Sequence, residues 1–191
     1  MGTQNKIAQS HKFLRALMAV IFAAGMTCIA APAAAEGWYA GASFGNAGDR
    51  NWCNTNLGAC DDTGSGKKIF AGNQINDFFA YEFGYNDLGK RSDIGISAEA
   101  TGFVVSLVGM IPIGDMFSIS LRVGTFYWDE DIRNTNPALS GSDDGPNLTL
   151  GIGAHIPMGK RFTARVEWER YDVNQDDINL LSAGIAYNFG K

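Results

Sequence analysis

The sequence contains no long hydrophobic run and no helical periodicity beyond its first 35 residues. A helix that crosses a membrane needs about 18 or more consecutive apolar residues, and residues 36–191 hold no such stretch. Apolar residues also fail to recur at the spacing of three to four that marks an amphipathic helix. These two absences exclude a helical membrane protein and a helix bundle for this part of the chain.

The sequence also has few residues suited to nucleic acids or metals. Lys and Arg number 15 against 20 Asp and Glu, so the formal net charge is -5, and no basic run provides the clustered cations that phosphate binding needs. The chain has 2 histidines and 3 cysteines, and neither Cys53 nor Cys60 has a further Cys or His nearby. The sequence therefore predicts no nucleic-acid partner, no metal site and no cofactor.

The first 35 residues have the composition of an export leader. Lys6, Lys12 and Arg15 precede the apolar run ALMAVIFAAGMTCIAAP, and AAA before Glu36 has the small-x-small form that signal peptidase cleaves. A membrane anchor is the alternative, but the run is short, rich in Ala and followed by a cleavage site. We therefore expect a signal peptide over residues 1–35 and one mature domain over residues 36–191, with a formal charge of -8.

The two cysteines of the mature chain are close together in a polar stretch. Cys53 and Cys60 lie within NWCNTNLGACDD, among Asn, Asp and Gly residues. In an exported protein such a pair predicts a disulfide bond that closes a surface loop. Two free thiols are the alternative.

What the mature chain does have is short segments in which apolar and polar or small residues alternate. A period of two indicates strands, and segments of about ten residues separated by turn-rich stretches are typical of a transmembrane barrel. The facing of one segment stays open, because residues 103–113 are apolar on both sides apart from Ser106 and Gly109. The eight segments are GWYAGASFG (37–45), KKIFAGNQ (67–74), DFFAYEFGY (77–85), FVVSLVGMIPI (103–113), FSISLRVGTFYW (117–128), NLTLGIGAHI (147–156), RFTARVEWERYDV (161–173) and INLLSAGIAYNFG (178–190).

The connections between these segments alternate in length. Brief turns around INDF, GDMF and MGKR join the second segment to the third, the fourth to the fifth and the sixth to the seventh. The other connections are expected to be longer, at residues 46–66, about 86–102 and 129–146, with a shorter one at 173–178. Short turns on one side and long loops on the other are the arrangement of an outer-membrane barrel. The predicted fold class is all-β, an eight-stranded antiparallel up-and-down transmembrane barrel.

One face of the predicted strands carries glycines and charges. Gly provides no packing area, and unpaired charge in an apolar interior is costly, so this face cannot form the core of a soluble sandwich. We expect it to line the barrel lumen, where Gly makes room for long charged side chains and where three cations and three anions pair with one another. The predicted lumen salt-bridge cluster consists of Lys68, Glu82, Arg122, Arg165, Glu167 and Glu169.

The opposite face is almost uniformly apolar, as contact with lipid requires. Its aromatic residues are too numerous along one face to be exposed to water. The predicted lipid-facing aromatics are Trp38, Phe79, Tyr81, Phe83, Tyr85, Trp168, Tyr187 and Phe189.

The mature chain resembles the OmpA-type transmembrane domain, a family of outer-membrane β-barrels that includes small OmpX-like barrels. The similarity rests on GWYAGASFG, on residues 60–89, on residues 105–129, and on RVEWERYDV with INLLSAGIAYNFG, and so covers nearly all of residues 36–191. It implies eight antiparallel strands in the bacterial outer membrane, both termini in the periplasm and loops that face outward. It also implies contact with outer-membrane lipid and lipopolysaccharide, and with the barrel-assembly machinery and periplasmic chaperones during biogenesis.

Three departures from the family pattern are visible. Family members often carry a peptidoglycan-binding domain after the barrel, whereas this sequence stops at Lys191, so we expect no cell-wall tether. Asn73 stands where the family usually has an aromatic at the membrane rim. The terminal aromatic used in insertion is usually the last residue, but Phe189 is followed by Gly190 and Lys191, which suggests weaker recognition by the assembly machinery.

Three classes of function remain to be compared. Outer-membrane enzymes use a His near the loops, but His155 lies near a short turn, so we predict no catalysis. Acidic pairs such as Asp143 and Asp144 lack the ligand spacing of a calcium site. The sequence favours a structural envelope barrel whose loops contact an extracellular ligand, with a narrow pore gated by the lumen salt bridges as the alternative.

Overall fold

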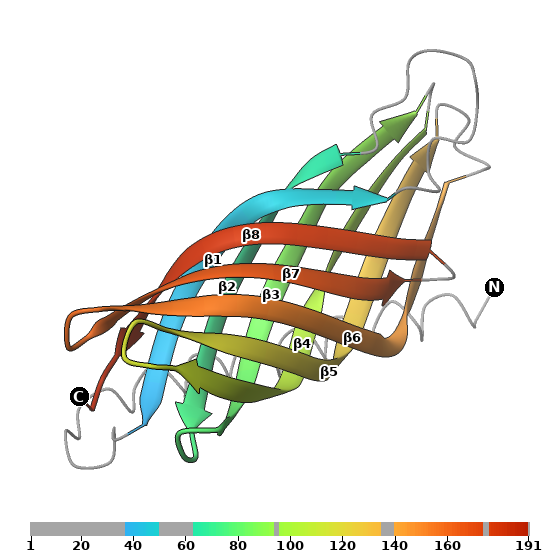
Figure 1. The fold of residues 1–191 in the computed structure, drawn as a ribbon. Helices are drawn as coiled ribbons and strands as arrows, with labels where there is room; N and C mark the ends of the chain where they lie inside the picture. Colours follow the sequence, from blue (N-terminus) through green and yellow to red (C-terminus); the bar gives the residue numbers. More distant parts are fainter. Residues whose placement is uncertain (1–36, 50–62, 94–95, 135–139, 174–175, 191) are drawn as a thin grey trace. The chain divides into compact units, whose positions relative to one another are not determined.

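The computed structural model describes residues 37–190 with gaps at 50–62, 94–95, 135–139 and 174–175. Eight antiparallel strands follow one another in chain order and close into a barrel (Figure 1). The sequence prediction of an eight-stranded up-and-down barrel is therefore confirmed. The strands are β1 Trp38–Asp49, β2 Thr63–Gln74, β3 Phe79–Asp93, β4 Ile96–Ile113, β5 Phe117–Asn134, β6 Gly141–Met158, β7 Phe162–Val173 and β8 Asp176–Asn188.

The pairing of the first strand with the last closes the sheet. β1 pairs with β8 from Tyr39↔Asn188 to Asp49↔Ile178, and with β2 from Trp38↔Asn73 to Gly48↔Thr63. A closed sheet has no strand edge, so in the part of the barrel where each strand has two neighbours the backbone groups are paired without help from water. This is the condition that a β-sheet must meet to sit in hydrocarbon.

The two ends of the barrel differ. At one end, here called the turn end, strands are joined through residues 75–78, 114–116 and 159–161. At the other, here called the loop end, strands β3 and β4 are separated by residues 94–95 alone, and β7 and β8 by residues 174–175. The long connections predicted at 86–102 and 129–146 are therefore wrong. Most of these polar residues belong to strands, because backbone pairing continues where the alternation of apolar side chains stops.

The extra strand length is concentrated on one side of the barrel. Strands β4, β5 and β6 have 18 residues each, and β3 has 15, whereas β1, β2 and β7 have 12. Figure 1 shows β3 to β6 continuing past the ends of β1, β7 and β8 at the loop end. Among the described residues, positions 141–148 of β6 pair with β5 alone, since β7 joins only at Thr149↔Tyr171.

The prolines in the strands fit this one-sided pairing. Pro146 lies in the part of β6 that pairs with β5 alone. Pro112 of β4 pairs with Ser118, beyond the last pairing of β4 with β3 at Gly109. Pro has no N–H to donate, so it is tolerated in a strand only where one side of the strand is free. These prolines therefore mark the ends of complete pairing and leave the closed part of the sheet intact.

The structure also determines the facing of β4, which the sequence left open. Val104, Ser106 and Val108 are buried in the lumen, while Val105 and Leu107 are 43% and 49% exposed on the outside. The described residues contain no helix that is long and apolar enough to cross a membrane. The predicted signal peptide at 1–35, Cys53 and Cys60 all lie outside the described residues.

Candidate functional site

The outer face of the barrel carries all eight aromatics that were predicted to face lipid. Trp38, Phe79, Phe83, Trp168 and Phe189 are 38–49% exposed. The three tyrosines of the set are half-buried because they pack edge to face against neighbouring rings, with centroid distances of 6.0 Å for Trp38–Tyr81, 5.0 Å for Tyr85–Phe103 and 5.1 Å for Tyr187–Phe189. These rings lie on the surface that a transmembrane barrel presents to lipid.

The lumen brings all six predicted charged residues together in one buried group, here called the charged cluster. They come from four strands: Lys68 from β2, Glu82 from β3, Arg122 from β5, and Arg165, Glu167 and Glu169 from β7. Each is at most 5% exposed. Alternation along each strand turns these positions inward, and the closure of the barrel brings β2 and β3 opposite β7.

Lys68 and Arg122 each contact all three carboxylates. Lys68 Nζ lies 3.0 Å from Glu167 Oε2, 2.9 Å from Glu169 Oε2 and 3.8 Å from Glu82 Oε1. Arg122 contacts the three carboxylates through three different nitrogens. Its Nη1 lies 2.7 Å from Glu82 Oε1, its Nη2 3.1 Å from Glu167 Oε1, and its Nε 3.1 Å from Glu169 Oε1. Each carboxylate therefore has two cations as neighbours, which offsets the cost of removing it from water.

Arg165 completes the group from the turn end. Its Nη1 donates to Glu82 Oε2 at 2.9 Å and its Nη2 to Glu167 Oε1 at 2.6 Å. The guanidinium also lies 4.2 Å from the centroid of the Phe70 ring, and Lys68 Nζ lies 5.4 Å from the same centroid. Tyr39 donates from its hydroxyl to Glu82 Oε2 at 3.1 Å. Phe70 and Tyr39 thus fill the space around the ions with ring surface that favours cations.

Glycines on β6 provide the room for these side chains, as the sequence predicts. A Cβ added at Gly151 would lie 3.0 Å from Glu169 Cγ, and one at Gly153 would lie 2.9 Å from Glu167 Cγ. Both distances are shorter than ordinary van der Waals contact. Larger residues on β6 would therefore push the glutamates of β7 away from their partners.

His155 lies on the inner face near the turn end. Its side chain is 12% exposed, and Nε2 is 3.5 Å from Glu167 Oε1. Register pairs His155 with Ser118 of β5 and Arg165 of β7, two inward positions. The histidine therefore borders the charged cluster and is distant in the fold from the loop end.

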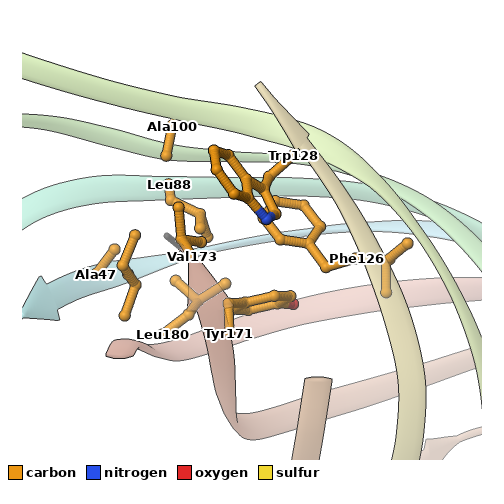
Figure 2. Packing of buried hydrophobic residues seen from close by; sticks show 10 residues of the cluster. Ala47, Leu88, Ala100, Phe126, Trp128, Tyr171, Val173 and Leu180 are labelled. Atoms are coloured by element: carbon orange, nitrogen blue, oxygen red, sulfur yellow. The ribbon is translucent and has the colours of Figure 1, made fainter. Parts of the chain in front are cut away.

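A second buried group of side chains, which is apolar, lies on the loop-end side of the charged cluster. Figure 2 shows its side chains pointing toward one another. Phe126 and Tyr171 pack edge to face with ring centroids 4.9 Å apart, and Trp128, the most exposed member of the group, is 5% exposed. This group, here called the apolar layer, consists of Ala47, Leu88, Ala100, Val104, Phe126, Trp128, Tyr171, Val173, Ile178 and Leu180.

Polar contacts join the apolar layer to the surrounding wall. Asn86 Nδ2 donates to the Tyr171 hydroxyl at 2.7 Å, and Trp128 Nε1 donates to Asn147 Oδ1 at 3.3 Å. Tyr171 is the second residue after Glu169 on β7, so the two groups of the lumen are contiguous along this strand.

The sequence prediction did not include the apolar layer, because the glycines and charges of the inner face indicated a lumen that is polar throughout. The signal was present in RVEWERYDV. The inward parity of Glu167 and Glu169 continues to Tyr171 and Val173, and the inward parity of Arg122 continues to Phe126 and Trp128. These apolar residues follow the last charged inward positions, where the sequence alone does not show that the strand continues. Without the strand end, their inward facing cannot be assigned.

The chemistry that this lumen can support is limited by its packing. The three cations of the charged cluster contact its three carboxylates, and the apolar layer lies between this cluster and the loop end. Glu130 of β5, which is 5% exposed, is a further buried carboxylate beyond Trp128. In the described part of the chain, no group of three or more His, Cys, Asp or Glu is placed to hold a metal ion. The inner face therefore carries one buried group of ion pairs and, next to it toward the loop end, one buried apolar group.

Comparison with known proteins places the chain among outer-membrane barrels. It is 27% identical to outer membrane protein A of Klebsiella aerogenes over 92% of this chain and 55% of that protein, so it spans about half the length of this curated relative. Two solved barrels share its fold. Neisserial surface protein A (NspA) matches with a TM-score of 0.64 and 15% identity, over 80% of this chain and 97% of that one. Ail of Yersinia pestis matches with a TM-score of 0.56 and 16% sequence identity, over 80% of this chain and 98% of the Ail chain.

A family model gives the assignment. The model described as the outer membrane protein beta-barrel domain matches residues 19–189, which is most of the chain. With the closed eight-stranded sheet and the apolar outer face, this match identifies an integral protein of the bacterial outer membrane. The chain belongs to the family of outer membrane protein β-barrel domains.

Proposed function

We propose that this protein is a non-conducting, non-catalytic barrel of the outer membrane, whose wall has a structural role in the envelope and whose loop end contacts partners outside the cell. The observation that carries the proposal is the two-part closure of the lumen. The charged cluster alone could rearrange in an electric field, but an ion that passed it would still have to cross the apolar layer.

The alternative of a narrow pore gated by salt bridges depends on the charged cluster being the only barrier. Phe126, Tyr171 and Leu180 are each fully buried on its loop-end side. Moving a charge through such an apolar region without partners costs far more than thermal energy. Separation of the ion pairs would therefore not be sufficient to open the lumen.

Conductance of the purified protein in planar bilayers tests this proposal. We expect no single-channel events from the wild type or from Glu82→Ala, in which the apolar layer is intact. Events should arise only when Phe126→Ala and Trp128→Ala are added to Glu82→Ala, with Val105→Ala on the outer face as the matched control. Steady channel events from wild type or from Glu82→Ala alone would reject the non-conducting barrel.

We place the loop end outside the cell, following the general orientation of barrels with short periplasmic turns. This end is acidic: Glu99 pairs in register with Asp131, and Asp129 with Asp144. Ail has been solved in complex with the heparin analogue sucrose octasulfate, which is a polyanion. Like charges repel, so an acidic loop end favours a basic extracellular partner over a sulfated one.

Salt dependence of binding tests the choice of partner. Vesicles that carry the protein should retain a lysine-rich peptide at low ionic strength and lose it as salt is added, because exposed charges are screened within about 10 Å at 0.1 M. Glu99→Gln with Asp131→Asn should weaken this retention, whereas Asp77→Asn at the turn end should not. Preferential retention of heparin would contradict the proposal.

Several accessory features belong to the same proposal. Residues 1–35 act as a cleaved signal peptide, and Cys53 and Cys60 form a disulfide bond that restricts the connection between β1 and β2. Outer-membrane lipid surrounds the apolar face, lipopolysaccharide contacts the loop-end rim, and the barrel-assembly machinery and periplasmic chaperones deliver the chain. Mass spectrometry of the mature protein tests the first two points, through an N-terminus at Glu36 and a mass gain on reduction.

A further inference from the structure

The outward apolar band of the barrel is taller on one side than on the other. On β6 the outward apolar positions run from Met158 at the turn end to Leu148. On β5 they run from Phe117 to Tyr127, with Thr125 as the one polar residue among them. With about 3.3 Å per residue and a strand tilt of about 40°, each run is about 25 Å high, which is the usual height of the apolar band in outer-membrane barrels. We call β4, β5 and β6 the tall face.

The band on β1, β2 and β3, here called the short face, stops earlier. The outward positions of β1 are apolar from Trp38 to Phe44, and those of β3 from Phe79 to Tyr85. The same geometry makes these runs about 15 Å high. Both ends contribute to the deficit. At the turn end, β4 continues to Ile113 beyond Gly109, the partner of Phe79. At the loop end, polar residues follow Phe44 on β1 and Tyr85 on β3.

The end of the band is clearly marked on both faces. On β1 the outward residue after Phe44 is Asn46, and on β5 the outward residue after Tyr127 is Asp129. An aromatic followed by a polar residue is the usual boundary between hydrocarbon and headgroups. The short and tall faces therefore have the same type of boundary at different heights.

Polar side chains occupy adjacent positions above the short band. Lys67 of β2 is next to Phe44 in register, and Ser65 is next to Asn46. All three polar residues are exposed, and Lys67 Nζ lies 4.0 Å from Asp87 Oδ2 of β3. Lys67 can extend its ammonium group toward headgroups, but Asn46 and Ser65 are too short to do so.

Tilting the barrel does not remove this mismatch. A tilt moves the band of one face up and that of the opposite face down, but it lengthens neither.

A bilayer that meets a hydrophobic surface shorter than its own hydrocarbon thickness adapts by thinning locally. From these band heights we propose that the short face is a lipid-contact surface that thins the leaflet at the loop end beside β1, β2 and β3. Its partner is the membrane itself, and the effect does not depend on whether the lumen conducts.

Spin labels at two outward positions test the thinning directly. Asn46→Cys on the short face and Leu148→Cys on the tall face are each labelled in a chain whose Cys28, Cys53 and Cys60 are replaced by Ser, then folded into dioleoylphosphatidylcholine vesicles. Heat-dependent gel mobility confirms that each variant is folded. We expect the Asn46 label to collide with a water-soluble relaxation agent and the Leu148 label with oxygen dissolved in hydrocarbon, although Leu148 is further from the turn end.

Two outcomes overturn the proposal. If the Asn46 label lies as deep in hydrocarbon as the Leu148 label, the bilayer keeps its thickness and the polar residues are submerged. If Asn46 labels on different molecules broaden each other's spectra, a second copy covers the short face and lipid does not. Water access at Asn46 without such broadening is the result that supports thinning.

A longer short face should change the preferred lipid. The double variant Asn46→Leu/Lys67→Leu adds one apolar layer to β1 and β2. We expect its folded fraction in dioleoylphosphatidylcholine, relative to dilauroylphosphatidylcholine, to rise several-fold over wild type. The matched control, Asp129→Leu/Asp144→Leu, adds two leucines just above the tall band and should leave the ratio unchanged. The proposal is contradicted if this ratio of folded fractions rises equally in both double variants, or if it does not rise in Asn46→Leu/Lys67→Leu.

Discussion

The charged cluster and the apolar layer fill the same lumen by opposite chemistry. In the charged cluster, Lys68 and Arg122 each contact all three glutamates. In the apolar layer, Phe126 and Tyr171 make ring contacts and are fully buried. A charged group keeps its stability only while every member has its partner, whereas an apolar group loses stability in proportion to the surface removed. Two equally buried groups of side chains should therefore lose very different amounts of stability after single substitutions.

The largest effect should come from breaking the charge balance. Glu82→Gln leaves Arg122 and Arg165 with one carboxylate fewer in a site that water does not reach, and we expect a loss of about 4 kcal/mol in the free energy of unfolding. Urea titration of the protein in thin vesicles, followed by gel mobility, measures it.

A neutral double variant sharpens this prediction. Glu82→Leu/Arg165→Leu removes one anion and one cation together, and should be more stable than Glu82→Gln, because apolar replacement of a whole buried pair is often tolerated. If Glu82→Gln and Glu82→Leu/Arg165→Leu are equally unstable, the loss of stability comes from lost packing and not from lost charge balance.

The apolar layer should respond less sharply. Phe126→Ala removes a ring with 0% exposure whose centroid is 4.9 Å from that of Tyr171. We expect a loss of about 3 kcal/mol, the lower part of the range for Phe→Ala in a core. The same urea titration measures it, with Val105→Ala on the lipid face as control. A loss below that of Val105→Ala would show that the layer is loosely packed.

Overpacking beside the charged cluster should have an intermediate effect. In Gly153→Ala the new methyl would lie 2.9 Å from Glu167 Cγ and 2.8 Å from Ser120 Oγ, and we expect a cost of about 2 kcal/mol. Gly109→Ala is the matched control, since its methyl would meet nothing nearer than Leu121 O at 3.9 Å. Equal stability of the two variants would mean that Glu167 moves freely, against the contacts described for it.

An ion pair outside the lumen should matter least. Lys67 and Asp87 approach to 4.0 Å with side chains 58% and 31% exposed. Lys67→Gln should change the free energy of unfolding by less than about 1 kcal/mol, because water screens such pairs. Added salt should have little further effect on the variant. A cost near that of Glu82→Gln would remove the distinction between buried and exposed charge on which the comparison rests.

Much of the fold was predictable because barrel strands obey a simple rule of period two. Trp168 between Glu167 and Glu169 fixed the outward and inward faces of β7, and Phe79 to Tyr85 did so for β3. The extent of the strands was not predictable, because polar residues such as Asp129 and Asp131 continue β5 without any change in side-chain pattern that distinguishes strand from loop. The apolar layer was missed for the same reason.

The alternation of residues along each strand is enough to predict which side chains face inward, since it depends only on local backbone geometry. The sequence also predicted that the inward charges sum to zero, but Glu130 of β5, only 5% exposed and on the inward parity of Arg122, adds a buried carboxylate that the prediction missed. Which charges meet depends on the closed barrel, because Lys68 and Glu169 are far apart in sequence and come within 2.9 Å of each other only when the sheet closes. The unequal height of the apolar band was likewise decided by the fold, because it emerges only when strands of different length are set side by side around a closed sheet.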